Sequence, residues 1–135
     1  MKLNDYRALR RAIATAEVEA ARDLGLPRAL DVDRLLVVWD EFVRDVNVGY
    51  WGSAYDYCHA LDIRDQLEAV LQRLDDPALD FVRDQAEPLD AALLASTTAD
   101  TRVFNPSDYS EPGAGWWWTR CPVNLGQLSR HRHAT

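Results

Sequence analysis

The sequence contains few of the residues on which metal sites and thiol chemistry depend. Its 135 residues include two cysteines, Cys58 and Cys121, and three histidines. One cysteine pair in a chain of this length does not make a disulfide scaffold, so we expect two free thiols in a reducing compartment. The histidines lack the recurrent spacing of a zinc site, which needs three or four protein ligands. We therefore predict no metal and no cofactor.

Long hydrophobic runs are absent as well. The longest strongly apolar run near the centre covers residues 35–39, far too short to span a bilayer. Near the N-terminus Arg7, Arg10 and Arg11 interrupt the stretch where a signal peptide needs an apolar segment. We expect a cytoplasmic protein that does not contact a membrane.

The recognisable catalytic and nucleic-acid-binding patterns are also missing. No serine lies in a nucleophile elbow, and there is no glycine-rich phosphate loop. Cys58 and His59 are adjacent, so on a helix they point in different directions and do not form a nucleophile–base pair. Basic patches interleaved with aromatic side chains are missing from the body of the chain. We predict no catalytic residues and no direct nucleic-acid binding.

Negative charge is abundant, and it is concentrated in the middle of the chain. The net charge is −7 overall, made up of +2 over residues 1–30, −7 over 31–76, −4 over 77–100 and +2 over 101–135. This distribution repels phosphates and attracts basic partners. We therefore expect any macromolecular partner to be basic.

Apolar residues at three- and four-residue spacing predict an all-α protein with about five helices. We predict helices over residues 4–24, from a cap at Asp31 or Asp33 to about Val46, over 53–60 and 63–74 with a bend near Leu61 and Asp62, and from Pro77 to about Leu94 with a kink or break at Pro88. A single kinked helix over 53–74 is the alternative for the middle pair.

The C-terminal part of the chain has a different character. Trp116, Trp117 and Trp118 are consecutive and show no helical periodicity. We expect an irregular segment packed across the helices, with two of these tryptophans buried and one partly exposed. We also expect Arg120 to pair with an acid of the central body. The prediction is one domain over residues 1–128 and a disordered tail over 129–135.

Five tryptophans in 135 residues, together with the acidic centre, favour a protein-binding module. The predicted module neutralises a basic protein, as immunity proteins and antitoxins neutralise toxins. The predicted partner-binding residues are Asp40, Glu41, Asp45, Tyr50, Trp51, Tyr55, Asp56 and Trp117. One alternative is a carboxylate- or metal-dependent enzyme that uses Glu41, Asp45 and Asp62. A second is a nucleic-acid mimic whose carboxylates imitate phosphates.

Several motifs together resemble a known group of proteins. They are Trp39-x-x-Phe42-Val43, Gly49-Tyr50, Tyr55-x-Tyr57-x-x-x-Leu61-Asp62-x-Arg64-Asp65-x-Leu67-Glu68, Pro88-Leu89-Asp90 and Gly115-Trp116-Trp117-Trp118-x-Arg120-x-Pro122. The arrangement, over roughly residues 35–122, resembles small acidic proteins of unknown function that are frequent in actinobacteria. The resemblance implies no activity and no catalytic residues. Cys58 and His59 lie where a pair such as Leu-Asn is expected.

Overall fold

Four α-helices make up most of residues 1–125, the part of the chain that the computed structural model describes. They are α1 (Leu3–Asp23), α2 (Val32–Val48), α3 (Ala54–Leu71) and α4 (Ala78–Ser96). They are followed by β1 (Thr97–Thr98), the 3-10 helices η1 (Pro106–Asp108) and η2 (Trp116–Thr119), and β2 (Cys121–Pro122). The all-α class is as predicted, with four helices in place of about five. The predicted tail at 129–135 and the predicted domain boundary at 128 lie outside the described residues.

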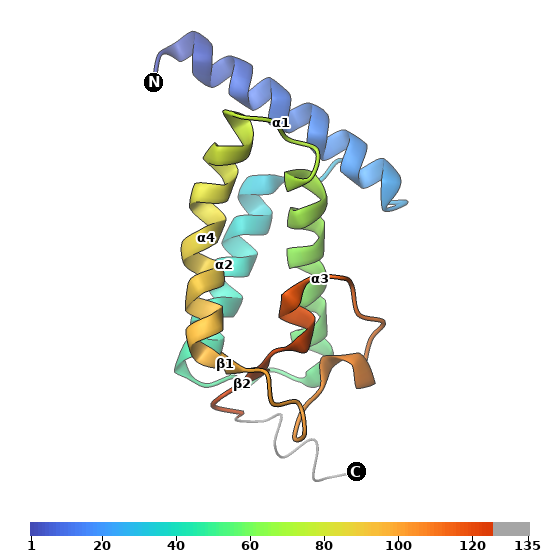
Figure 1. The fold of residues 1–135 in the computed structure, drawn as a ribbon. Helices are drawn as coiled ribbons and strands as arrows, with labels where there is room; N and C mark the ends of the chain where they lie inside the picture. The colour runs from blue at the N-terminus through green and yellow to red at the C-terminus, as the bar shows by residue number, and fades with distance from the viewer. Residues whose placement is uncertain (126–135) are drawn as a thin grey trace.

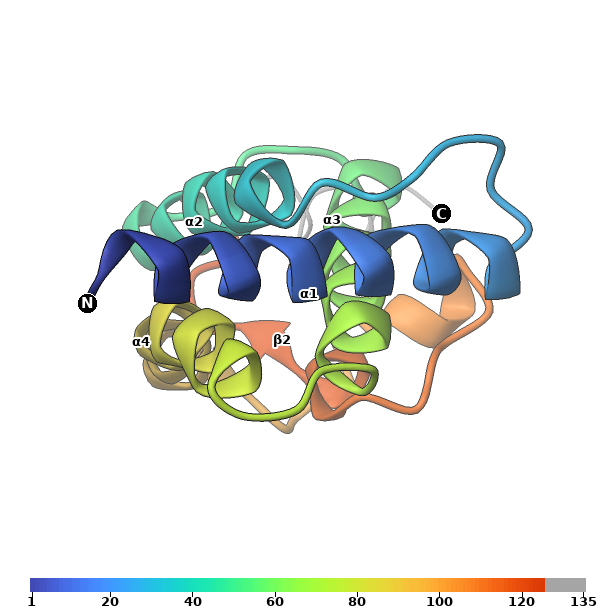
Figure 2. The same ribbon diagram turned by 90° about the horizontal axis from the view of Figure 1, so that it is seen from above.

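Helices α2, α3 and α4 run alongside one another, and α1 lies across one end of them (Figure 1). Seen from above, α1 passes over α3 and runs between the ends of α2 and α4 (Figure 2). At the other end β1 pairs with β2 in antiparallel register, with Thr97 opposite Pro122 and Thr98 opposite Cys121. We call residues 97–125 the C-terminal segment. The β1–β2 pairing returns the last residues of this segment to the end of α4.

Helix α1 buries the middle of its predicted apolar stripe. The buried residues are Leu9, Ile13, Ala16, Ala20 and Ala21. Their small alanines allow the helix to lie close against its neighbours. The two ends of the stripe, Tyr6 and Leu24, remain 40% and 46% exposed. The physical reason is length, because α1 extends past the bundle on both sides (Figure 1).

Side-chain caps define the starts of α2 and α3, and the first of them, Asp31, is one of the two predicted candidates. Asp31 accepts a hydrogen bond from the Arg34 backbone nitrogen at 3.3 Å, and Ser53 accepts one from that of Asp56 at 3.0 Å. Such caps satisfy backbone donors that the first turn of a helix leaves unpaired. Helix α2 ends at Gly49, whose φ of +135° is a conformation that side-chain-bearing residues rarely adopt.

Two predicted helix breaks do not occur. Helix α3 continues through Leu61 and Asp62, so the alternative of one helix over this stretch is the correct one. Leu61 is fully buried, and a continuous helix keeps it on the same face as Tyr57. Helix α4 continues through Pro88. This proline is exposed, so water can satisfy the backbone carbonyl that its ring leaves without a donor.

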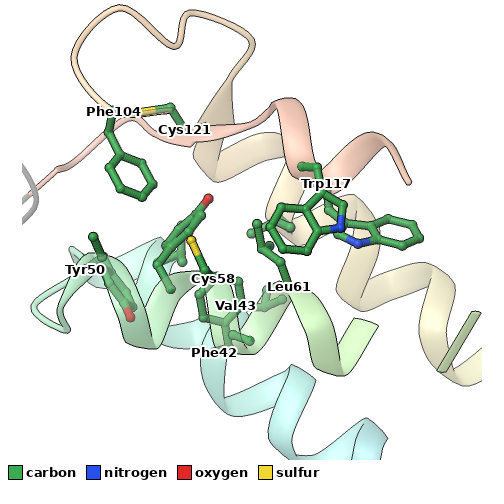
Figure 3. Close-up of a cluster of buried hydrophobic side chains, with 14 of the residues drawn as sticks. Phe42, Val43, Tyr50, Cys58, Leu61, Phe104, Trp117 and Cys121 are labelled. Carbon is green, nitrogen blue, oxygen red and sulfur yellow. The ribbon is translucent and has the colours of Figure 1, made fainter. Parts of the chain in front are cut away.

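The buried side chains form two clusters along the bundle. One lies beneath α1 and includes Leu9, Ile13, Leu67 and Val82. The other joins α2 and α3 to the C-terminal segment. In it, side chains of the C-terminal segment, such as Phe104, Trp117 and Cys121, face Phe42, Val43, Cys58 and Leu61 of the two helices (Figure 3). The C-terminal segment is therefore part of the core.

The tryptophan run forms a 3-10 turn, η2, with no extended stretch. Trp117 and Trp118 are 3% and 2% exposed, while Trp116 is half-buried, as expected for two buried rings and one partly exposed ring. The expected pairing of Arg120 with an acid is wrong for the described residues. Its guanidinium donates to Thr97 Oγ1 at 2.9 Å and to the Thr97 and Leu94 carbonyls at 2.6 and 3.2 Å. Arg120 thereby supports the β1–β2 contact.

Candidate functional site

The turn between α2 and α3 presents exposed apolar side chains beside carboxylates. Val48, Trp51 and Tyr55 are 79%, 64% and 78% exposed. Asp45, at the end of α2, and Asp56, in the first turn of α3, are exposed on either side of them along the chain. We call these five residues the turn surface. Large exposed aromatic side chains next to charged groups are typical of protein-binding surfaces.

Tyr50 belongs to the same turn but is buried, and its hydroxyl donates to the Ser53 carbonyl oxygen at 3.3 Å. It is 5% exposed, and its ring packs edge-on against Phe42 and Tyr57. Burial raises the pKa of the Tyr50 phenol well above its usual value, and the nearby Asp56 and Asp45 carboxylates raise it further. The phenol therefore stays neutral and anchors the turn from beneath.

The eight predicted partner-binding residues thus divide into two groups. Tyr50 and Trp117 are in the core, where they are 5% and 3% exposed and stabilise the fold. Trp51, Tyr55, Asp45 and Asp56 belong to the turn surface, and Asp40 and Glu41 lie further back on α2.

Asp40 and Arg44 form an ion pair four residues apart on α2. Arg44 Nε lies 2.8 Å from Asp40 Oδ1. Glu41 is exposed beside this pair and carries its own charge. The described surface of α2 nearest the turn is therefore acidic on balance.

A buried ion-pair network lies between α3 and α4. Arg64 is 4% exposed, and its Nε and Nη2 donate to the two Asp90 oxygens at 3.0 and 2.8 Å. Its Nη1 donates to Glu68 at 3.0 Å, and Trp39 Nε1 donates to Asp90 at 3.0 Å. Burial alone would lower the pKa of the Arg64 guanidinium, but Asp90 and Glu68 outweigh it and hold that pKa above its ordinary value.

Asp65 attaches the C-terminal segment to α3. Its Oδ1 accepts a hydrogen bond from the Trp117 indole nitrogen at 2.8 Å. The Trp118 indole nitrogen donates to both carboxylate oxygens of Asp65 at 3.0 Å. The Arg64 guanidinium lies 4.3 Å from the centre of the Trp117 ring. Burial raises the pKa of the Asp65 carboxyl, although the two indole hydrogen bonds favour its ionised form. Together these contacts hold both buried tryptophans in place.

Sequence reasoning missed this network, although every member of it lies in a motif quoted above. Helical spacing places Asp65 and Glu68 on a helix but does not reveal a partner on another element. One sequence feature could have indicated the network. It is the occurrence of Arg64, Asp65 and Glu68 in the same set of motifs as Asp90 and the tryptophan run. These residues carry the resemblance, and the fold brings them together.

The proposed enzyme residues do not converge on a metal site. Within residues 1–125 no group of three or more histidine, cysteine, aspartate or glutamate side chains is arranged to hold a metal ion. Glu41 and Asp45 lie on α2, whereas Asp62 lies on α3, where burial and the neighbouring Asp65 raise its carboxyl pKa. The described residues therefore offer no specific support for the metal-dependent alternative.

Both thiols are buried. Cys58 Sγ lies 3.5 Å from the Pro106 carbonyl oxygen, and the adjacent His59 is exposed. Burial raises the pKa of Cys58 and of Cys121 to about 11. A thiol with such a pKa is protonated at neutral pH, so neither group is an activated nucleophile.

No helix within residues 1–125 combines the length and the apolar character needed to cross a bilayer. No family model, no curated protein and no solved structure matches the chain. The resemblance to small acidic actinobacterial proteins therefore stays an expectation.

Proposed function

We propose that this protein is a protein-binding module that neutralises a basic protein partner, in the manner of an immunity protein or antitoxin. The observation that carries the proposal is the turn surface, where Trp51 and Tyr55 are 64% and 78% exposed between two carboxylates. Exposed side chains of this size are the residue types that contribute most to binding energy at protein interfaces.

Charge supplies the second part of the recognition. Residues 40–62 carry five carboxylates and one arginine, Arg44, which is paired with Asp40. A basic partner is attracted to such a surface, and complementary charge raises association rates while the aromatic anchors slow dissociation. Asp40, Glu41, Asp45 and Asp56 act as the charged surroundings of the two aromatic anchors.

The test is affinity capture from a native lysate of the source organism, with the full chain as bait at low and at moderate salt. We expect a basic protein to be retained by the wild type and lost with the double variant Trp51→Ala/Tyr55→Ala. The matched control is Val37→Ala, a change at a side chain that is 57% exposed on α2. Circular dichroism confirms that all three baits are folded.

Three outcomes contradict the proposal. The first is that no protein is retained at moderate salt. The second is that the captured protein is acidic. The third is that the Trp51→Ala/Tyr55→Ala bait retains the protein as well as the control does. Neutralisation is then tested by co-expression of the captured protein with the wild type or with the double variant.

A further inference from the structure

A groove lies between α3 and α4, away from the turn surface. Its volume is about 870 Å³, and residues 113–117 of the C-terminal segment form part of its wall. Leucines from both helices contribute the apolar part of the lining, among them Leu71 and Leu79. The groove is open to solvent, and its size suits a side chain together with part of the segment that carries it.

The groove exists because of how the helices are packed. Helix α2 packs extensively against both α3 and α4, whereas those two helices contact each other much less. Small side chains, Ala69 of α3 and Ala86 of α4, lie along the groove where larger ones would close it. Trp116 contributes a half-buried ring to the wall, packed edge-on against the buried Trp117.

The polar lining of the groove is acidic on balance. It contains four carboxylates, from Asp65, Glu68, Glu87 and Asp90, and two arginines. One of the arginines, Arg64, is buried and bound to Asp90 and Glu68. The excess negative charge disfavours an anionic occupant, and a purely apolar occupant would strip water from carboxylates without replacing their hydrogen bonds.

We propose that the α3–α4 groove binds an arginine or lysine side chain presented on an amphipathic segment of the basic partner. This inference rests on the proposed function and adds a second contact to it. The Glu68 side chain is 37% exposed, so its carboxylate meets Arg64 on one side and the groove on the other. Glu87 is exposed on the rim and supplies a second carboxylate.

The remaining walls match the rest of such a segment. The Trp116 ring offers a face for the cationic group or for the methylene groups of its side chain, an arrangement known for arginine and lysine beside tryptophan. The leucines of the lining accept the apolar residues of the segment. The groove thus offers carboxylates to the cationic group, an aromatic ring to its side chain and an apolar surface to the neighbouring residues.

The experiment uses the full chain labelled with 15N and two synthetic peptides. The first is a capped twelve-residue peptide with arginines and leucines at helical spacing. The second is identical except that citrulline, which is neutral and of nearly the same shape, replaces every arginine. We expect the first peptide to cause saturable shifts of the Trp116 indole and Gly113 amide signals. We expect the citrulline peptide to bind at least about tenfold more weakly.

Substitutions in the chain then locate the site. We expect Glu87→Gln and Glu68→Gln each to weaken binding about two- to fivefold, the range of single partly exposed ion pairs. Asp33→Asn, at an exposed carboxylate in the first turn of α2, is the control and should leave binding unchanged. Because Glu87 is exposed, its variant keeps the fold and the result is interpretable even where Glu68→Gln is unstable.

The outcomes separate this inference from the proposed function. Equal binding of the citrulline peptide, or shifts confined to the turn surface, overturns the groove as a site for a basic side chain. Equal losses for Asp33→Asn and Glu87→Gln overturn it as well, because they indicate diffuse charge attraction. Since the peptide titration needs no natural partner, it can succeed where lysate capture fails. The titration can also fail while capture succeeds. The partner would then bind through Trp51 and Tyr55 without the groove, and only the groove inference would be overturned.

Discussion

Replacement of Arg64 by methionine tests whether the buried ion-pair network holds α3 to α4. Methionine keeps most of the volume of the side chain but removes its charge and all of its hydrogen bonds. Among the described residues Asp90 is then left with the Trp39 indole as its donor, and its side chain is only 17% exposed. Removing one partner of a buried ion pair costs about 3–5 kcal/mol, since the remaining charge stays poorly solvated.

Other contacts of Arg64 change this figure little. Glu68 is 37% exposed, so water replaces much of what it loses. The guanidinium–Trp117 contact adds about 0.5–2 kcal/mol at a partly desolvated site. A loss of about 4 kcal/mol is a large share of the roughly 5–15 kcal/mol that stabilise a small domain. It corresponds to a decrease of about 2 M in the urea midpoint.

The assay is urea unfolding followed by tryptophan fluorescence. Two further variants separate loss of the ion pair from a general disturbance. In Arg64→Met/Asp90→Asn the asparagine oxygen still accepts from Trp39, and the one charge that loses its partner, Glu68, is 37% exposed. We expect this double variant to be more stable than Arg64→Met alone. Arg44→Met removes the exposed partner of Asp40 and should leave the midpoint unchanged.

The reasoning is refuted if Arg64→Met unfolds at the same urea concentration as Arg44→Met. It is also refuted if the losses of unfolding free energy are additive. In that case Asp90→Asn would cost as much in the Arg64→Met background as it does in the wild type. In either case the network would contribute nothing beyond the packing of its side chains.

Three further predictions concern the C-terminal segment and its contacts. Gly115→Ala should lower the free energy of unfolding by about 1–3 kcal/mol, because a Cβ there would overlap the buried Trp117 ring. Asp65→Asn should destabilise the fold more at about pH 3 than at about pH 7. Burial raises the Asp65 pKa, so its contribution is present below the unfolded pKa and is lost as pH rises through the folded one. Cys58 and Cys121, each 3% exposed, should react with an aromatic disulfide reagent at least about tenfold faster in urea than in buffer.

Each of these predictions has a contrary result. Ala114→Val changes an exposed neighbour of Gly115, and an equal loss of stability in both variants would contradict the overlap with Trp117. A deficit of Asp65→Asn that grows as pH rises, measured by thermal unfolding, would contradict the direction of the pKa shift. Rapid modification of both thiols in buffer would show that the C-terminal segment opens readily.

The local features of the fold were predictable from short stretches of sequence. The stripes of α1 and α2, the caps at Asp31 and Ser53 and the end of α2 at Gly49 all follow from contacts within a few residues. Helical spacing determines which face is apolar, and the caps depend on donors in the next turn. The all-α class is a consequence of the same local pattern, whereas the burial of Tyr50 beside the exposed Trp51 is not.

Tertiary structure decided what local signals could not. Helix α3 continues past Asp62 because burial of Leu61 stabilises the continuous form, and helix α4 continues past Pro88 because that position is exposed. In both places a residue that favours a helix break in an isolated peptide lies inside a continuous helix of the folded protein.

The same distinction applies to the candidate sites. Trp117 is buried because Asp65, 52 residues away in the sequence, accepts its indole hydrogen bond. Arg64 finds its main partner, Asp90, 26 residues away on another helix. Sequence spacing determines the faces of a helix, but only the packing of one element against another determines which charged side chains are buried and which remain exposed to a partner.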